Sequence, residues 1–491
     1  MPLAEAERRN GVDKYLREGR DFIDEAAIEA AVGRAKPDAA AVRSVIAKAL
    51  SSRETLEPRE TALLLNTEDH DLLEEMYAAA AAVKKAVYDN RVVTFAPLYC
   101  SNLCENNCLY CGFRAGNPAG TRRRLSINEI KKETEVLCGA IGHKRLVMVF
   151  GEHPSTGADY IAEAARAVYA VKVNTRKGTG QIRRVNVNAA PMAVEDLRKL
   201  KAAGIGTFQV FQETYHRGRY AEVHPGDSAK SDFRWRLYAM HRAFEAGIDD
   251  VALGALFGLH DWKFEVMGLL AHAKELERAF GVGPHTISFP RIEEAAGTDF
   301  HRENGRAVND RDFKKLVAVL RLSIPYAGML VTARERPEVI RSVIPMCTQR
   351  DASSRIGIGA YSDRYSAQEA GRQQFLLGDT RALDEVIGEL ADMGHITSFC
   401  TSGYRCGRTG DHIMKSLKSG GEGRFCKLNA VLTFREWLDD FASSATRAKG
   451  ERLILKEIDE ILASGAYSGE MKKKLSEYHR RVEAGERDLC F

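Results

Sequence analysis

Three cysteines in one short loop have the spacing of a metal-cluster site. Cys104, Cys108 and Cys111 form a Cys-x3-Cys-x2-Cys arrangement, which supplies three thiolates. An iron–sulfur cube held by three protein sulfurs keeps one iron open for a ligand from outside the protein. A structural zinc site with Cys100 as a fourth ligand is the alternative, because zinc usually takes four protein ligands in such sites.

The loop resembles that of the radical S-adenosylmethionine (SAM) superfamily in its spacing, in Tyr110 before the last cysteine and in the Gly-Phe pair that follows. The resemblance implies that the open iron of a 4Fe–4S cluster chelates the amino and carboxylate groups of SAM. It also implies a 5′-deoxyadenosyl radical, which forms when the cluster passes an electron to the sulfonium. We expect an anaerobic setting, because an open-iron cluster is sensitive to oxygen.

Polar residues at predicted strand ends are candidates for holding SAM. Glu152 follows Gly151, and a glycine lets the backbone approach a ligand while the carboxylate accepts the ammonium of the methionine part. An ordinary turn carboxylate is the alternative. Gln212 and Glu213 are candidates for hydrogen bonding to the ribose hydroxyls of SAM or to part of a substrate. A polar layer that closes the barrel is the alternative. Arg236 is a candidate for the SAM carboxylate or for a surface ion pair.

Thr332 and Arg334 form a candidate site for a substrate carboxylate. Their two-residue interval places both on one side of a predicted strand. A planar guanidinium beside a hydroxyl suits a carboxylate held by two hydrogen bonds. An internal ion pair of Arg334 with Glu335 or Asp351 is the alternative.

These candidates need strands that end near one another. From about residue 92, apolar strands alternate with helix-like segments. The predicted strands are 92–99, 146–151, 185–189, 207–213, 250–258, 286–292, 328–334 and 355–359. Such α/β units close most naturally into a (β/α)8 TIM-type barrel, whose chemistry gathers at the C-terminal strand ends. An open doubly wound sheet is the alternative.

Helical regions are predicted on both sides of the barrel. Residues 1–88 read as an N-terminal helical extension, 89–382 as the barrel and 383–491 as a mostly helical C-terminal domain. In the last region, Cys400, Cys406 and Cys426 lie within 27 residues among glycines. This clustering predicts a second metal-binding module.

Composition excludes several classes of protein. The 491 residues carry 72 basic and 68 acidic side chains, a net charge of +4, which gives no argument for nucleic-acid or membrane binding. The basic run 122–124 is interpreted as solvated surface. Ten cysteines are too few for a disulfide scaffold, and no apolar stretch approaches the ~18 residues of a spanning helix. We therefore predict a cytoplasmic protein.

The stretch from about residue 96 to 440 resembles the radical SAM tyrosine lyase that matures di-iron hydrogenase, and more distantly the thiamine-pathway tyrosine lyase. The matching runs are Ala96-Pro-Leu-Tyr, Cys108-Leu-Tyr-Cys-Gly-Phe-Arg, Gly151-Glu-His-Pro, Val185-Asn-Val-Asn, Phe211-Gln-Glu-Thr-Tyr-His, Glu245-Ala-Gly-Ile-Asp-Asp, Gly283-Pro-His-Thr-Ile-Ser, Ser398-Phe-Cys-Thr and Gly407-Arg-Thr-Gly. The resemblance implies that the radical takes hydrogen from the amino group of tyrosine and that the Cα–Cβ bond breaks into p-cresol and dehydroglycine. It also implies a reductant such as ferredoxin or flavodoxin, and a maturation partner protein.

Carried over by motif, the resemblance assigns roles to residues of this chain. The three loop cysteines hold the cluster, Tyr110 and Glu152 contact SAM, and Thr332 and Arg334 hold the amino-acid carboxylate. The family uses a further Cys-x2-Cys-x22-Cys motif for a second cluster that converts dehydroglycine to carbon monoxide and cyanide.

The second motif departs from the family pattern. Cys400 and Cys426 stand at its outer positions, but the middle position is Gly403, which offers no ligand. Cys406 is a nearby substitute, so a re-liganded cluster on Cys400, Cys406 and Cys426, no cluster, and a zinc site or disulfide all stay open. Carbon–carbon cleavage does not depend on this choice.

Two other functions remain as alternatives. One keeps the radical and changes the substrate, for instance to tryptophan. The other is a non-catalytic metal-binding maturation scaffold, against which the complete cysteine loop and the Gly151-Glu152 pair argue.

Overall fold

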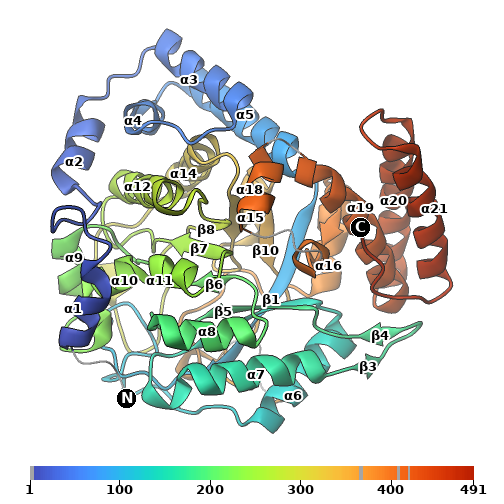
Figure 1. Cartoon of the computed structure of the whole chain (residues 1–491), viewed down its shortest axis with the longest axis horizontal. Coiled ribbons are helices and arrows are strands. Elements are labelled where there is room, and N and C mark those ends of the chain that lie inside the picture. The colour runs from blue at the N-terminus through green and yellow to red at the C-terminus, as the bar shows by residue number, and fades with distance from the viewer. Residues whose placement is uncertain (1–4, 364–368, 406–409, 419–420) are drawn as a thin grey trace.

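A closed parallel barrel forms the centre of the protein (Figure 1). The computed structural model describes residues 5–363, 369–405, 410–418 and 421–491. The barrel strands are β1 (Val92–Ser101), β2 (Arg145–Phe150), β5 (Arg184–Asn188), β6 (Phe208–Gln209), β7 (Val251–Gly254), β8 (Thr286–Ser288), β9 (Gly328–Val331) and β10 (Gln349–Asp351). Each pairs in parallel with the next, and β10 pairs with β1 at Gln349 and Val93. This closure confirms the predicted barrel and rules out the open sheet.

Helices between the strands cover the outside of the barrel. They are α6 (Ile127–Glu135), α7 (Ala158–Ala170), α8 (Val194–Ala202), α9 (Arg217–Val223), α10 (Phe233–Leu237), α11 (Ala239–Glu245), α12 (Trp262–Phe280), α13 (Phe300–Glu303), α14 (Asp310–Ser323) and α15 (Pro337–Val343). Side-chain caps fix several starts. Ser126 and Glu129 form a reciprocal capping box at α6, and Asp261 accepts from the backbone N–H of Phe264 at α12.

The last barrel strand is not where the sequence placed it. The predicted strand 355–359 is irregular and ends in a turn, and β10 lies at 349–351 instead. The run Gln349-Arg-Asp351 is polar and so lacks the apolar signature of a buried strand. It is polar because Gln349 hydrogen-bonds Thr286 at 3.0 Å, Arg350 pairs with Asp379 at 3.0 Å, and Asp351 lines the central cavity.

The N-terminal helices pack on one side of the barrel. They are α1 (Glu5–Asp13), α2 (Glu25–Arg34), α3 (Ala39–Ser52), α4 (Pro58–Asn66) and α5 (His70–Tyr88). Helices α4 and α5 contact α12 and α14 of the barrel. No helix within the described ranges has the length and apolar character needed to cross a bilayer.

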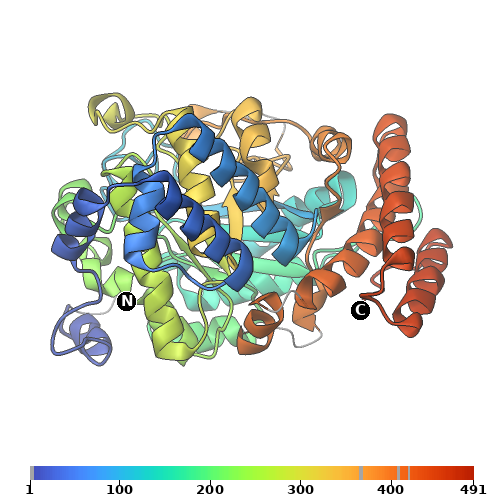
Figure 2. The same ribbon diagram turned by 90° about the horizontal axis from the view of Figure 1, so that it is seen from above.

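The C-terminal elements lie along the opposite side, and α20 and α21 form one end of the molecule in both views (Figures 1 and 2). They are α16 (Leu383–Asp392), β11 (Thr397–Ser398), α17 (Ser402–Arg405), α18 (Gly410–Lys418), α19 (Gly421–Asp440), α20 (Ser444–Ala463) and α21 (Gly469–Glu483). A small hairpin, β3 (Val173–Asn174) and β4 (Thr179–Gly180), extends toward them, and Arg176 beside it donates to the Asp440 carbonyl at 2.8 Å. Buried Glu436 of α19 pairs with Lys144 at 3.1 Å and Arg183 at 2.9 Å, which fixes α19 to the barrel.

Candidate active site

One cavity at the C-terminal ends of the barrel strands gathers the cysteines of the first loop and nearly all of the residues predicted to bind SAM or the substrate. Its lining includes Cys104, Cys108, Tyr110, Cys111, Glu152, Glu213, Arg236, Thr332 and Arg334. Gln212 is buried but lies outside this lining. The barrel therefore brings together side chains that are up to 230 positions apart in the sequence (Cys104 to Arg334).

The cysteine loop is fixed to its neighbours through the backbone. Glu105 donates its N–H to the Glu152 carbonyl at 3.0 Å, and Gly112 donates to the Gln374 carbonyl at 3.0 Å. A Cβ added at Gly151 would lie 2.1 Å from the carbonyl oxygen of Leu103. The sequence interpretation expected Gly151 to make room for a ligand, whereas the structure shows that the close approach is to the cysteine loop.

Arg122 joins the two ends of the cysteine loop. Its guanidinium donates to the carbonyls of Asn102 at 3.1 Å and Phe113 at 2.9 Å, and also to the carbonyl of Arg114. Asn102 precedes the first cysteine by two residues, and Phe113 follows the last by two. The interpretation of the run 122–124 as simple surface was therefore wrong for Arg122, which is half-buried.

We expect Arg122→Gln to weaken iron retention in the loop, because two or three charge-assisted hydrogen bonds across its ends are lost, each typically contributing about 1.5–3 kcal/mol. Iron removal by a chelator should be several-fold faster than in the wild type. Arg124→Gln is the control, because Arg124 is exposed and contacts Ser155 and Tyr160 instead. Equal rates for the two variants would contradict this positioning role.

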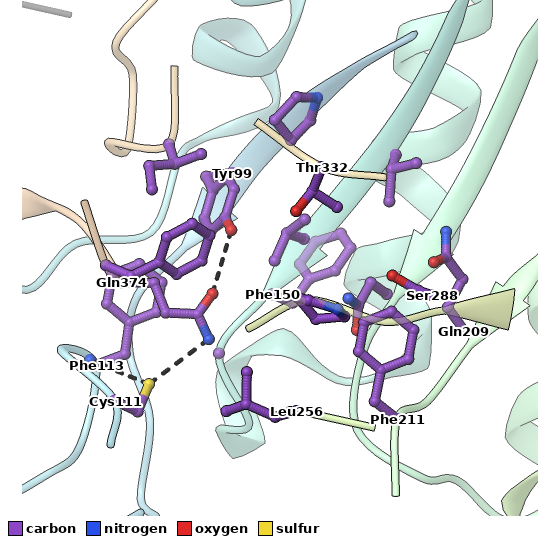
Figure 3. Close-up of a pocket in the computed structure, with 18 of the residues that line it drawn as sticks. Tyr99, Cys111, Phe113, Phe150, Gln209, Phe211, Leu256, Ser288, Thr332 and Gln374 are labelled. Carbon is purple, nitrogen blue, oxygen red and sulfur yellow. Dashed lines mark hydrogen bonds between the residues drawn. The ribbon is translucent and has the colours of Figure 1, made fainter. Parts of the chain in front are cut away.

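The three thiols share a buried environment that suits a cationic metal core. Burial, together with Glu152 and Cys111, raises the pKa of Cys104 to about 11, and burial also raises the pKa of Cys108 and Cys111. Cys111 Sγ accepts from the Phe113 N–H at 3.4 Å and from Gln374 at 3.6 Å, while Tyr99 donates to Gln374 at 3.2 Å (Figure 3). Buried thiolates need positive charge to form, which an iron–sulfur core provides.

Cys100 does not join the other three cysteines. Its side chain is fully buried, lies within hydrogen-bond distance of the Leu98 carbonyl at 3.6 Å and is absent from the cavity lining. Among the residues that the structure describes, no three His, Cys, Asp or Glu side chains converge on one ion position.

Two carboxylates and two cations form a network beside the cysteines. Arg236 donates to Glu152 at 2.8 Å, to Glu213 at 3.3 Å and to the Phe211 carbonyl at 2.6 Å. Lys230 pairs with Glu213 at 2.8 Å. Burial opposes ionisation of Glu152, but Arg236 and Lys230 hold the pKa of its carboxyl below the usual range. The network presents an ionised Glu152 to the cavity, with the donors of Arg236 already engaged by the chain.

Tyr110 is held in place by a neutral histidine. Its hydroxyl lies 2.8 Å from His224 Nε2, and His224 Nδ1 lies 2.9 Å from the Tyr220 carbonyl. Burial, with Lys230 and Arg236 nearby, holds the pKa of His224 well below its usual range. The neutral imidazole then donates to Tyr220 and accepts from Tyr110, which fixes the ring of Tyr110 against the cysteine loop.

Thr332 and Arg334, which follow β9, also line the cavity, and the Thr332 hydroxyl points into it (Figure 3). Within the described chain, Thr332 Oγ1 is buried without a hydrogen-bond partner and no carboxylate lies within ion-pair distance of Arg334. The guanidinium stacks on Phe375 at 3.3 Å from the ring centre. The two expected alternatives for Arg334 are occupied elsewhere: Glu335 pairs with Arg291, and Asp351 accepts from the Ala333 N–H at 2.7 Å.

Glu213 adopts an unusual backbone conformation that a buried residue of α12 supports. Its φ is +72°, which is uncommon for a residue other than glycine. Glu265 receives the Tyr215 N–H at 2.9 Å and hydrogen-bonds the Thr214 hydroxyl, so it fixes the two residues that follow Glu213. Burial raises the pKa of Glu265 to about 8, which keeps the carboxyl protonated at neutral pH.

We expect Glu265→Gln to fold with the same loop geometry and to remove a pH-dependent loss of stability. The unfolded chain ionises Glu265 near the usual pKa of a glutamate, whereas the folded chain keeps it protonated up to about pH 8. The contribution of Glu265 to the free energy of unfolding is therefore complete below the unfolded pKa, and it is lost as the pH rises toward 8. The amide has no such loss, and at pH 8 the variant should be more stable by about 2–4 kcal/mol. Thermal unfolding at pH 5 and pH 8 measures this. A wild-type pH dependence that persists in the variant would contradict it.

Comparison with known proteins places this site in a family. The model of the radical SAM superfamily matches residues 98–270, and that of the Biotin and Thiamin Synthesis associated domain matches 288–396. The 2-iminoacetate synthase of Salmonella typhimurium is 30% identical over 334 residues, covering 67% of this chain and 83% of the relative. The chain belongs to the radical SAM superfamily.

Solved structures agree with this assignment. A crystal structure of HydG, a maturase of the FeFe hydrogenase, has a TM-score of 0.90 and 42% identity over 96% of this chain and all of that chain. HydG from Carboxydothermus hydrogenoformans has a TM-score of 0.76 and 33% identity over 97% and 99% of the two chains. The predicted resemblance to the hydrogenase-maturing tyrosine lyases is confirmed. This radical SAM enzyme is related to lyases, and membership of the family implies a 4Fe–4S cluster and SAM.

Several site residues were not found from the sequence. Lys230, Asn106, Gln374 and His224 all contact predicted site residues, and Ser288 lines the cavity. Only Asn106 lies within a motif, between the first two cysteines, so its position could have suggested a role in the site. It donates to Glu152 at 2.9 Å.

Proposed function

We propose that the protein is a tyrosine lyase that cleaves the Cα–Cβ bond of its substrate to p-cresol and dehydroglycine. Thr332 and Arg334, in the same cavity as the three-cysteine loop, carry this proposal, because within the described residues Thr332 Oγ1 is buried without a partner and Arg334 contacts only a carbonyl, that of Arg291 at 3.5 Å, and the ring of Phe375. The name of the curated relative, 2-iminoacetate synthase, supports the assignment of the imino-acid product to this family.

The chain's own residues bind and orient the reactants. When bound, the cluster and SAM supply a radical that removes a hydrogen atom from the amino group of tyrosine. Cys104, Cys108 and Cys111 hold the cluster and Tyr110 packs beside it. Glu152 accepts the ammonium of SAM and Glu213 its ribose hydroxyls.

Arg236, which the sequence suggested for the SAM carboxylate, is assigned a different task by its contacts. It orients Glu152 and Glu213, since its donors already point to them.

Ser288 is the proposed partner of the phenol hydroxyl. Its side chain is fully buried, lines the cavity and has an Oγ without a partner within the described residues. Ser288 is level with Leu330 in the sheet, two residues deeper than Thr332, a rise of roughly 7 Å. Phe150, Phe211 and Leu256 give the same cavity apolar walls (Figure 3). An aromatic amino acid held at Arg334 therefore directs its ring toward Ser288.

We expect Ser288→Ala to reduce the preference for tyrosine over phenylalanine by up to about tenfold, the effect of losing one buried hydrogen bond. The ratio of kcat/KM values for deoxyadenosine formation with the two substrates measures this. Phenylalanine serves as the internal control, because it has no hydroxyl for Ser288 to bind. An unchanged ratio would remove Ser288 from the substrate site.

The apolar walls also confine the substrate, because a primary carbon radical abstracts hydrogen from whichever suitable C–H or N–H bond lies nearest. A reductant such as ferredoxin or flavodoxin completes the proposal. Conversion of dehydroglycine to carbon monoxide and cyanide would need a second metal centre and is separate from carbon–carbon cleavage.

The test is anaerobic turnover. The reconstituted protein, reduced with dithionite and given SAM and tyrosine, should form deoxyadenosine and p-cresol together. If neither product forms, the tyrosine assignment is refuted. Deoxyadenosine that rises with tryptophan and not with tyrosine would identify a different substrate for the same clamp.

A further inference from the structure

A second cavity lies at the other end of the barrel. Its lining includes Arg91, which directly precedes β1, and His285, which directly precedes β8. It therefore lies at the N-terminal strand ends, away from the cysteine loop. The C-terminal elements close it with Cys400, Gly403 and the first turns of α19.

Two thiols and one carboxylate face this cavity. Cys400, Glu422 and Cys426 all line it, together with Gly403. Glu422 and Cys426 are four residues apart at the start of α19, so they share a helix face, and Cys426 Sγ lies 3.7 Å from Glu422 Oε1. Glu422 is only 2% exposed. The predicted third cysteine, Cys406, lies outside the described residues.

Buried polar groups in the same cavity point to a missing ligand. Arg91 is 4% exposed and Ser402 is 3% exposed, and in the described part of the chain neither Arg91 Nε nor Ser402 Oγ has a hydrogen-bond partner. A buried polar atom without a partner costs about 1–3 kcal/mol. Arg91 lines the cavity together with Cys400, Glu422 and Cys426, so a guanidinium lies beside the three side chains that carry negative charge when they bind a metal.

We propose that Cys400, Glu422 and Cys426 hold a second iron–sulfur cluster, with the Glu422 carboxylate as the ligand that Gly403 does not provide. Cluster irons accept ligands other than cysteine, and a carboxylate is a suitable oxygen ligand for iron. Three anionic ligands around a cationic core leave an excess of negative charge that Arg91 neutralises. This inference goes beyond the proposed function, because cleavage of tyrosine needs the first cluster only.

The experiment counts iron and sulfide in the full-length chain after anaerobic reconstitution. Wild-type protein should bind about eight irons, and Glu422→Gln about four, since the amide keeps the shape and loses the charge. The Glu422→Asp variant should keep most of the irons of the second cluster, because it keeps the carboxylate. In a background with Cys104, Cys108 and Cys111 all changed to alanine, about four irons should remain and Glu422→Gln should remove them. The EPR spectrum of the reduced triple variant should change when Glu422→Cys replaces the oxygen ligand by sulfur.

Two further variants complete the test. Glu460→Gln is the control, because Glu460 pairs with Lys427 beside Cys426 at 2.8 Å but does not line the cavity, and it should keep all the iron. Cys406→Ser should also keep it. The proposal would be overturned if the triple variant bound no iron. It would also be overturned if the second set of irons survived Glu422→Gln and was lost with Cys406→Ser or Glu460→Gln. No tyrosine or SAM is used, so failure here is distinct from failure of the lyase assignment.

Discussion

Replacing Arg334 by glutamine should raise the KM for tyrosine by about 100-fold or more while leaving the iron content unchanged. Arg334 stacks on Phe375 in the cavity and has no carboxylate within ion-pair distance in the described chain. The proposed function makes the substrate carboxylate its counter-charge. Removing one partner of a buried, hydrogen-bonded charge pair typically costs about 3–5 kcal/mol, and each 1.4 kcal/mol is tenfold in affinity.

The measurement is the tyrosine dependence of deoxyadenosine formation under reducing, anaerobic conditions. Arg336→Gln is the matched control, because Arg336 is exposed and pairs with Asp310 at 2.8 Å on the surface. Thr332→Val should give a smaller increase in KM, since one neutral hydrogen bond contributes about 1 kcal/mol. A KM unchanged in Arg334→Gln would exclude a carboxylate clamp at this position.

The barrel could be predicted because its strands obey simple rules. Apolar runs at regular spacing, separated by helical segments, define most of the strands, and the polar residues that follow β1, β2 and β9 converge for that reason alone. Strand β10 could not be found, because Gln349 and Asp351 serve the interior of the barrel with polar groups. A strand that carries function on its inner face loses its hydrophobic signal.

The cooperating partners within the site were beyond prediction for a related reason. Arg236 lies on a short helix and Lys230 in a single helical turn, and nothing in their spacing relates them to Glu152 or Glu213. Their roles arise only from where the chain folds back over the barrel mouth. The position of Glu422 could be predicted only in part. One helical turn places it beside Cys426, but tertiary packing places it in the same cavity as Cys400.

Gly151→Ala should disrupt the cysteine loop more than its size suggests. The added Cβ would lie 2.1 Å from the Leu103 carbonyl oxygen, a contact with backbone that no side-chain rotation can relieve. Leu103 directly precedes Cys104, so the displacement reaches the first thiol. Overpacking of this kind costs about 1–3 kcal/mol, which the fold can tolerate, but a cluster needs its three sulfurs in fixed positions.

We therefore expect Gly151→Ala to remain folded, to lose most of the roughly four irons bound by the loop and to lose SAM cleavage with them. Iron counting, circular dichroism and deoxyadenosine formation measure the three effects. Gly157→Ala is the control, because its Cβ would lie 3.6 Å from its nearest neighbour, the Pro154 carbonyl, in ordinary contact. Full iron content in Gly151→Ala would show that β2 and the cysteine loop can separate without cost. The close approach would then have no part in holding the cluster, and Glu152 alone would explain why this strand ends beside it.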